Sequence, residues 1–164
     1  MNGRELDLAF MKEAIGEAQK AELEGNLPIG CVIVLDGTII SRGHNAVLVP
    51  VYDPGNHAEI QAIRSVPKKM WAKAKKMVLY TTMEPCVMCM GTVLLHGIGR
   101  VVFGAFDKNG GSTCTLHHLP RYYDNGGVPE WNGPLCPEIC DPLYDRSIEI
   151  FQTLPCAVPS DEAL

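Results

Sequence analysis

The segments His57-Ala58-Glu59 and Pro85-Cys86-Val87-Met88-Cys89 decide the layout and the chemistry of this chain. They supply one imidazole and two thiols, which are ligands that zinc prefers. Three protein ligands leave one coordination position open, and this distinguishes catalytic zinc sites from closed structural ones. The two segments therefore predict one zinc ion per chain, bound by His57, Cys86 and Cys89.

Glu59 stands two residues past the histidine, where it can exchange protons beside the open coordination position. Zinc lowers the pKa of a bound water towards about 7, which provides hydroxide at neutral pH. A carboxylate can accept the proton of that water and pass it to a ring nitrogen and then to a departing amine. This arrangement suits hydrolytic attack on an amidine-like carbon that bears an exocyclic NH2, with release of ammonia.

Each part of the motif also has a structural interpretation. Glu59 follows Asn56 by three residues and could be the glutamate of a capping box. Cys86 and Cys89 form a Cys-X-X-Cys pair, which is a redox motif in other proteins. A purely structural zinc would need a fourth ligand, and the candidates are Cys114, His117 and His118. The combination of three ligands with Glu59 favours catalysis, because a structural site needs no proton shuttle.

Length and composition indicate an ordinary globular domain. The chain has 164 residues, of which 46% are hydrophobic and 20% charged. No apolar run approaches the roughly 18 residues that span a membrane, and residues 1–7 lack the pattern of a secretory signal. Because a thiolate site also needs reduced cysteines, we expect a cytoplasmic protein. The net charge of −5 favours a small-molecule partner over a nucleic acid, whose phosphates bind lysine and arginine.

Hydrophobic periodicity and turn residues predict alternating helices and strands. The expected elements are a helix over 5–24, strands over 31–35 and 38–42, a helix from 57 to 66, a strand over 77–82, a helix from 85 to about 96 and a strand over 100–105. Asp36-Gly37 is a strong hairpin signal between the first two strands. Asn56 is the expected N-cap of the second helix. This alternation indicates an α/β protein with a partly parallel sheet.

The periodicity weakens after residue 105. Residues 106–146 are predicted to form a long loop, and long loops in compact domains are usually functional. Residues 147–152 alternate enough to be a last strand. Cys136 and Cys140, with Cys114, only weakly indicate a second metal site. No repeat or linker divides the sequence, so we predict a single domain over residues 1–164.

The segment 68–76 contains five of the fourteen basic residues of the chain, namely Lys68, Lys69, Lys73, Lys75 and Lys76. A solvated surface is the usual explanation for such a run. The alternative is a patch that binds phosphate groups.

Several short motifs occur in the order of a known family. They are Leu27-Pro28-Ile29-Gly30, Gly43-His44-Asn45, Asp53-Pro54, His57-Ala58-Glu59-Ile60, Leu79-Tyr80-Thr81-Thr82 and Glu84-Pro85-Cys86-Val87-Met88-Cys89. Over residues 5–108 the chain resembles the cytidine/deoxycytidylate deaminase superfamily, and within it the branch of bacterial tRNA adenosine deaminases, guanine deaminases and fungal-type cytosine deaminases. The resemblance implies a three-layer α/β/α sandwich around a five-stranded mixed sheet, and a homodimer. It also implies zinc on His57, Cys86 and Cys89, with Glu59 as the proton shuttle.

By this resemblance, Asn45 hydrogen-bonds the base, and the backbone around Ala58 and Pro85 lines the pocket. The tRNA adenosine deaminases usually carry a basic C-terminal helix, whereas this chain has a short acidic tail. We therefore expect the loop over 106–146 to close the pocket in place of a C-terminal helix. The candidate aromatic walls in that loop are Tyr122, Tyr123 and Trp131, and the equally open alternative is that they are packing residues.

These observations lead to one main expectation and two alternatives. The chain is expected to be a hydrolase of C–N bonds that deaminates a free nucleobase or nucleoside. A purine such as guanine or adenine is slightly favoured over cytosine. The first alternative is a tRNA-specific adenosine-to-inosine deaminase. The second belongs to another class and is a non-catalytic zinc-binding module.

Overall fold

A helix and a hairpin open the chain in the computed structural model, which describes residues 3–124 and 127–154. Helix α1 spans Gly3–Leu23, and strands β1 (Gly30–Leu35) and β2 (Thr38–His44) follow. Asp36 and Gly37 both have positive φ, 48° and 77°, as in the two-residue turns whose twist matches that of paired strands. The predicted helix and hairpin are confirmed.

One mixed sheet of five strands forms the middle layer, with the order β2-β1-β3-β4-β5. Strands β3 (Val78–Met83), β4 (Arg100–Ala105) and β5 (Glu130–Asn132) run parallel to one another, whereas β1 is antiparallel to both of its neighbours. The parallel part of the sheet places the carboxyl ends of β3 and β4 side by side. The segments that leave these ends therefore meet at one edge of the sheet.

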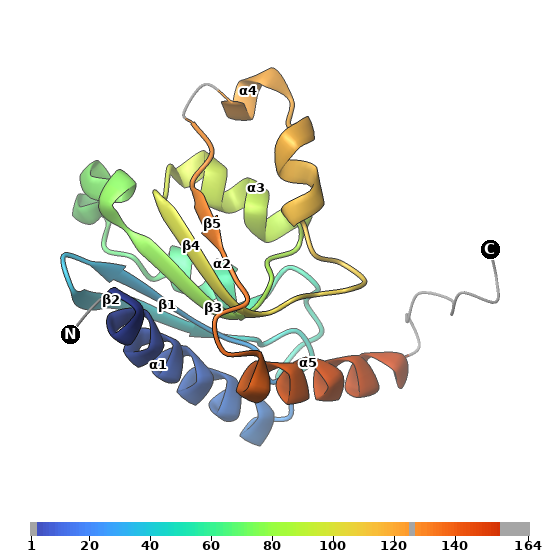
Figure 1. Cartoon of the computed structure of the whole chain (residues 1–164). Coiled ribbons are helices and arrows are strands. Elements are labelled where there is room, and N and C mark those ends of the chain that lie inside the picture. The colour runs from blue at the N-terminus through green and yellow to red at the C-terminus, as the bar shows by residue number, and fades with distance from the viewer. Residues whose placement is uncertain (1–2, 125–126, 155–164) are drawn as a thin grey trace.

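Helices cover both faces of this sheet (Figure 1). On one face α1 and α5 (Pro137–Gln152) pack against Val32, Val34, Tyr80 and Val102. On the other face α2 (Ala58–Arg64) and α3 (Val87–His96) pack against Cys31, Ile33, Leu79 and Val101. Neighbouring strand residues thus point to opposite cores, as the two-residue repeat of a strand requires. The expected three-layer α/β/α sandwich is confirmed.

Three short elements complete the chain. They are the 3-10 helix η1 (Lys68–Lys76), the 3-10 helix η2 (Thr113–His118) and the short helix α4 (Arg121–Asp124). Among the described residues, no helix combines the length and apolar character needed to cross a bilayer. The prediction of one domain over residues 1–164 stays a prediction, because residues 1–2, 125–126 and 155–164 lie outside the described part.

The C-terminal region differs from the prediction. The strand expected over 147–152 is wrong, because these residues are the end of helix α5. Cys140, Tyr144 and Ser147 are its buried residues, and their spacing of four and three positions is that of one helix face. Six residues of apparent alternation were too short to reveal this stripe. The fifth strand is β5 instead, and the region 106–146 contains η2, α4, β5 and the start of α5 rather than one long loop.

A partly buried ion pair ties α1 to the sheet. Arg100 donates two hydrogen bonds to the Asp7 carboxylate, at 2.8 Å and 2.7 Å, and the Tyr80 hydroxyl donates a third at 2.7 Å. Burial opposes ionisation of Asp7, but the hydrogen bonds from Arg100 and Tyr80 outweigh it and lower the pKa of this carboxyl below its usual value. The three side chains come from α1, β3 and β4, so the pair fixes the first helix across the parallel strands.

Candidate metal centre and active site

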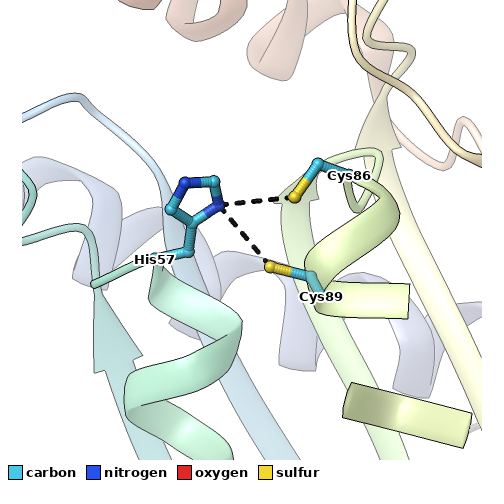
Figure 2. A group of neighbouring side chains, drawn as sticks. All are labelled: His57, Cys86 and Cys89. Atoms are coloured by element: carbon cyan, nitrogen blue, oxygen red, sulfur yellow. Dashed lines mark hydrogen bonds between the residues drawn. The ribbon is translucent and has the colours of Figure 1, made fainter. Parts of the chain in front are cut away.

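Two helix starts converge at the edge of the sheet. His57 is the N-cap of α2 and Cys86 is the N-cap of α3, both with extended backbone (ψ 157° and 173°). Figure 2 shows the imidazole of His57 facing both thiols. Its Nδ1 lies 3.6 Å from Cys86 Sγ and 3.5 Å from Cys89 Sγ.

The expected N-cap at Asn56 is wrong, and this difference matters for the site. The Asn56 side chain accepts a hydrogen bond from Gln61 Nε2 (2.7 Å) and donates one to the Ala46 carbonyl (3.2 Å). It therefore braces the loop before α2 and leaves the cap position to His57. An extended residue at the cap can turn its side chain away from the helix, and His57 turns it towards the cysteines.

The three donor atoms fit a zinc ion. Zinc bonds to sulfur at about 2.3 Å and to nitrogen at about 2.0 Å, so a tetrahedral site separates its S and N ligands by about 3.5 Å. The observed separations of 3.6 Å and 3.5 Å match this value. In the part of the chain that is described, His57, Cys86 and Cys89 are the one metal-ligand group of this kind, with ligand atoms within 4.8 Å of one another. Cys114, His117 and His118 do not belong to it, which leaves the fourth position to a non-protein ligand.

One thiol of the pair is readily ionised. The hydrogen bond from Cys89 lowers the pKa of Cys86 to about 4, although burial opposes this shift. The same hydrogen bond, together with burial, raises the pKa of Cys89. Cys86 is therefore a thiolate at neutral pH, the form in which sulfur binds metals. The two sulfurs are free rather than joined in a disulfide.

Glu59 lies against the metal centre. Its side chain is 3% exposed, accepts a hydrogen bond from the Thr81 hydroxyl (2.8 Å) and lies 3.4 Å from Cys89 Sγ. No side chain caps α2 by a hydrogen bond, so the capping-box interpretation of Glu59 is wrong. Burial raises the pKa of Glu59, and this brings the carboxyl closer to the pH range in which it can exchange protons. Thr81 was not assigned to the site from the sequence.

A glycine allows α2 to approach the sheet closely enough to deliver these residues. A Cβ atom on Gly43 of β2 would overlap the carbonyl oxygen of Ala58 and the amide nitrogen of Ala62. Backbone atoms cannot move aside as a flexible side chain can. The position of His57 and Glu59 therefore depends on the absence of a side chain at residue 43.

A small pocket lies beside the metal ligands. Its walls are formed by Ile29, Asn45, His57, Ala58, Glu59, Met83, Glu84, Cys86 and Asp107. Asn45 and Ala58 are thus located where the resemblance implied, but Pro85 is buried behind Cys86 and does not line the pocket. Asn45 is 1% exposed, and its Oδ1 accepts a hydrogen bond from the Val47 amide at 3.1 Å. Glu84 and Asp107 are wall residues that the sequence had not assigned.

Glu84 joins the metal-binding segment to the loop after β4. Its buried carboxylate accepts hydrogen bonds from the Thr113 amide (2.9 Å) and the Asp107 amide (3.1 Å), one on each oxygen. A Cβ atom on Gly111 would overlap this carboxylate. The loop 107–113 therefore closes around Glu84 and brings Asp107 to the pocket wall.

Ser112 fastens the same loop to the residue that precedes Cys86. Its amide and its hydroxyl both donate to the Pro85 carbonyl, at 3.1 Å and 2.6 Å. Gly111 also forms an isolated bridge with Cys86. The only sequence signal for this arrangement is Gly110-Gly111-Ser112, since a lone glutamate before Pro-Cys indicates no partner. Loop 107–113 thus supports the first cysteine ligand directly.

The other candidates from the C-terminal region lie outside the pocket. Trp131 packs against the core and donates a hydrogen bond to Thr113 Oγ1 (2.9 Å). Tyr122 is 72% exposed and contacts the Tyr123 ring edge-on. None of the three lines the pocket beside the metal ligands, and the packing alternative describes Trp131. His117 and His118 are exposed.

The proposed second metal site does not form. Cys136, the N-cap of α5, and Cys140 within this helix are buried with their sulfurs 3.7 Å apart, whereas Cys114 is exposed on η2. Within the described residues, these cysteines belong to no group that could hold a metal.

Comparison with known proteins identifies the family. The sequence profile of the cytidine and deoxycytidylate deaminase zinc-binding region matches residues 4–105. The chain belongs to this deaminase family. Its membership agrees with the resemblance found in the sequence, with a zinc cofactor and with hydrolysis of a C–N bond, and it excludes the alternative of a non-catalytic zinc module.

Three relatives show where the chain stands within the family. It is 45% identical over 115 residues to the tRNA-specific adenosine deaminase of Bacillus subtilis, covering 69% of this chain and 70% of that protein. A solved tRNA:A34 deaminase matches with a TM-score of 0.64 and 31% identity, over 87% of this chain and 99% of that one. The guanine deaminase of Bacillus subtilis matches with a TM-score of 0.57 and 26% identity, over 97% and 99% of the two chains.

The expected free nucleobase or nucleoside substrate is contradicted by these relatives. The preference for it rested on the net charge of −5 and on the missing C-terminal helix. Net charge describes the whole surface, whereas a polyanion contacts one part of it. The helix, moreover, is present as α5, although its composition is acidic. The slight preference for a purine such as guanine or adenine over cytosine concerned a free base, and a free-base specificity has no support over tRNA in these relatives.

Proposed function

We propose that this protein is a zinc-dependent deaminase that converts adenosine to inosine in tRNA. The observation that carries the proposal is the placement of a buried glutamate beside a three-ligand zinc site, in a chain 45% identical to a tRNA-specific adenosine deaminase. The 31% identical tRNA:A34 deaminase supports the same substrate, and its whole length is matched. The guanine deaminase is less similar, at 26% identity.

Each residue of the site has a distinct role in the reaction. His57, Cys86 and Cys89 would hold the zinc ion, with the imidazole bound through Nδ1. When bound, the ion supplies the Lewis acidity that makes water nucleophilic at neutral pH. Glu59 accepts the proton of the attacking water through the oxygen that faces the metal centre, while Thr81 holds its other oxygen.

Proton transfer by Glu59 completes the hydrolysis. Water adds to C6 of adenine as Glu59 transfers one of its protons to N1; Glu59 then takes the remaining proton from the C6 hydroxyl and gives it to the departing 6-amino group. The C6–N bond breaks, ammonia leaves and a carbonyl remains. Each step needs the carboxyl to change between its two protonation states, which its burial favours by raising its pKa towards neutrality.

The remaining pocket residues would orient the base. The side-chain oxygen Oδ1 of Asn45 accepts a hydrogen bond from the Val47 amide, so the side-chain NH2 group would face a ring nitrogen of the base. The backbone of Ala58 would lie along one edge of the base. Pro85 would act through Cys86 and Ser112, since it does not reach the pocket wall.

Assembly and location belong to the same proposal. Val87, Met88 and Leu95 are 59%, 40% and 58% exposed on α3, and such apolar side chains favour a homodimer through this helix. A mass of one chain, measured by light scattering at micromolar concentration, would contradict the dimer. The thiolate ligands favour the reducing cytoplasm, and recovery of the protein in an oxidising compartment would contradict that location.

Replacement of Glu59 tests the function directly. The variant Glu59→Ala is expected to bind zinc and to unfold at a temperature close to that of the wild type, yet to lose about 10²–10⁴-fold or more in the rate of inosine formation from tRNA. The matched control is Glu149→Ala on the exposed face of α5. Inosine is measured after nuclease digestion, with guanine, cytosine and free adenosine as parallel substrates. Wild-type enzyme that deaminates a free base but not tRNA would overturn the proposal.

A further inference from the structure

The 3-10 helix η1 is the densest cluster of positive charge in the chain. Its nine residues include Lys68, Lys69, Lys73, Lys75 and Lys76 and no acidic residue, and all five lysines are exposed. The whole chain has a net charge of −5, so the remainder without these lysines carries −10 (−5 − 5). A polyanion that binds this protein must therefore meet it at a local patch, and η1 offers the strongest one.

Hydrophobic contacts fix the backbone of η1. Met70, Trp71 and Ala74 pack against the core on the α2–α3 side of the sheet. The Trp71 ring also lies 4.6 Å from the ring of His96 at the end of α3. Because these side chains point inward, the lysines between them point outward from a backbone that is already ordered. An ordered array loses less entropy on binding than a flexible tail would.

Ion pairs between described residues do not account for Lys68, Lys69, Lys73 and Lys76. Lys73 pairs with Asp36 at 3.5 Å, but both side chains are more than half exposed, so the pair contributes little. In the described ranges Lys68, Lys69 and Lys76 take part in no ion pair. The end of α3 contributes a partial negative charge of about −0.5, which several lysines outweigh.

The lysines border a groove large enough for part of a nucleotide. Lys73, Lys75 and Lys76 line it together with Trp71 and Gly97, and its volume is about 300 Å³. A lysine-rich helix that served only solubility would need no concave surface. Positive charge around a groove is instead the usual arrangement for following a sugar–phosphate backbone.

The distance between η1 and the metal ligands indicates how large a partner must be to contact both. The 3-10 helix η1 ends at Lys76, with only Met77 before β3, whereas the two cysteine ligands follow the last residue of that strand. The six residues of β3 span about 20 Å at roughly 3.3 Å per residue. A free base or nucleoside cannot reach both places at once, but an RNA can. In Figure 1 the green coils of η1 lie at the end of the sheet where β3 begins.

We infer that η1 is a second contact surface for the tRNA substrate, which binds its sugar–phosphate backbone about 20 Å from the reacting base. This inference rests on the proposed function, because it assumes that the substrate is an RNA. The lysines supply sequence-independent affinity, and the pocket selects the adenosine.

Paired lysine substitutions test the inference. Lys69→Gln with Lys76→Gln removes two charges from the patch, and Arg4→Gln with Lys12→Gln removes two exposed charges from α1 on the other face of the sheet. Binding of tRNA is followed by fluorescence anisotropy between about 0.05 and 0.3 M salt, with Glu59→Ala in every chain so that the substrate is not consumed. The replacement of the same two lysines by arginine is the rescue control, since it keeps the charge.

The expected result is specific to the patch. The loss of two phosphate contacts should reduce the slope of log Kd against log salt concentration by about 1.5. It should also weaken tRNA binding roughly 10- to 20-fold at about 0.15 M salt. The arginine pair and the α1 pair should bind like the parent chain. If the η1 double variant and the α1 double variant bound tRNA equally well, the inference would be overturned. Absence of inosine formation by the wild type would overturn the proposed function itself.

Discussion

The glutamate before Pro85 offers the sharpest test of how the metal centre is supported. Glu84→Gln keeps the size of the side chain but replaces one carboxylate oxygen by an NH2 group. In the wild type each oxygen accepts one backbone N–H, from Asp107 and from Thr113. The glutamine can accept only one of them, so its NH2 group must face the other donor.

The magnitude follows from these two hydrogen bonds. A hydrogen bond to a charged group contributes about 1.5–3 kcal/mol, and a neutral acceptor about 1 kcal/mol, so the bond that survives loses about 1 kcal/mol. The other bond is replaced by an unsatisfied buried donor, which costs a further 1–3 kcal/mol or so. The total is about 2–4 kcal/mol. For a chain of this length it corresponds to a decrease in Tm of about 5–10 °C if the loss is global.

The loss can also remain local to loop 107–113. That loop can detach while the sheet stays folded, and it would then release its contacts with Cys86 and Pro85. Changes in the groups that support metal ligands typically lower metal affinity by about 10–100-fold. We expect zinc affinity of Glu84→Gln to fall by at least about 10-fold, whether or not Tm falls by the full amount.

Three measurements separate these outcomes. Zinc affinity is measured by competition with a chromophoric chelator, stability by thermal unfolding, and catalysis by kcat/KM for tRNA. Glu149→Gln is the matched control, because it makes the same chemical change on the exposed side of α5. If Glu84→Gln retained the zinc affinity and Tm of this control, the reasoning from the two hydrogen bonds would be refuted.

Two further predictions concern the frame of the site. Asp7→Asn should lower the free energy of unfolding by about 2 kcal/mol at pH 7, because it leaves the Arg100 charge partly buried without its partner. Folding lowers the pKa of Asp7, so this stabilisation is present above the ordinary carboxyl pKa and disappears as the pH falls below about 4. Plots of Tm against pH for the wild type and the variant should therefore converge at low pH. Parallel plots would contradict the prediction. Gly43→Ala should lower stability by about 2–3 kcal/mol and impair zinc binding, because its methyl group meets the backbone of α2 at Ala58. The control is Gly16→Ala, at a position where an added methyl group meets no other atom. If Gly43→Ala matched this control in Tm and zinc content, α2 could shift without consequence and the prediction would be wrong.

Local signals predicted the first two thirds of the chain well. Asp36-Gly37 sets a hairpin through the φ angles of two adjacent residues, and Gly97 ends α3 with a φ of 72°. Both effects act within a few residues, so they can be read without knowing what packs nearby. The strand Arg100–Ala105 was likewise predicted at its observed bounds, because its apolar run is bounded by glycine and a polar loop.

The last third depended on contacts that no local pattern contains. Residues 147–152 were predicted to be a strand, but Tyr144 and Ser147 are helical because they pack on β3 and β4 from the α1 side. The aromatic residues Tyr122 and Trp131 suggested a pocket wall, yet their place is set by α4 and β5. The wrong substrate had another origin, since the net charge of −5 was given more weight than the lysine-rich segment 68–76, which is visible in the sequence itself.

By itself the sequence indicated the family of the chain, the three candidate zinc ligands and the proposed proton transfer by Glu59, because few other functions require His-X-Glu and Cys-X-X-Cys together. Only the tertiary structure decided that Glu84 and Thr81 support these residues, that Asp107 reaches the pocket, and that η1 presents its charges about 20 Å away. The physical reason is that parallel strands bring together segments far apart in the sequence. Hydrogen bonds between such segments leave no periodic trace in either one.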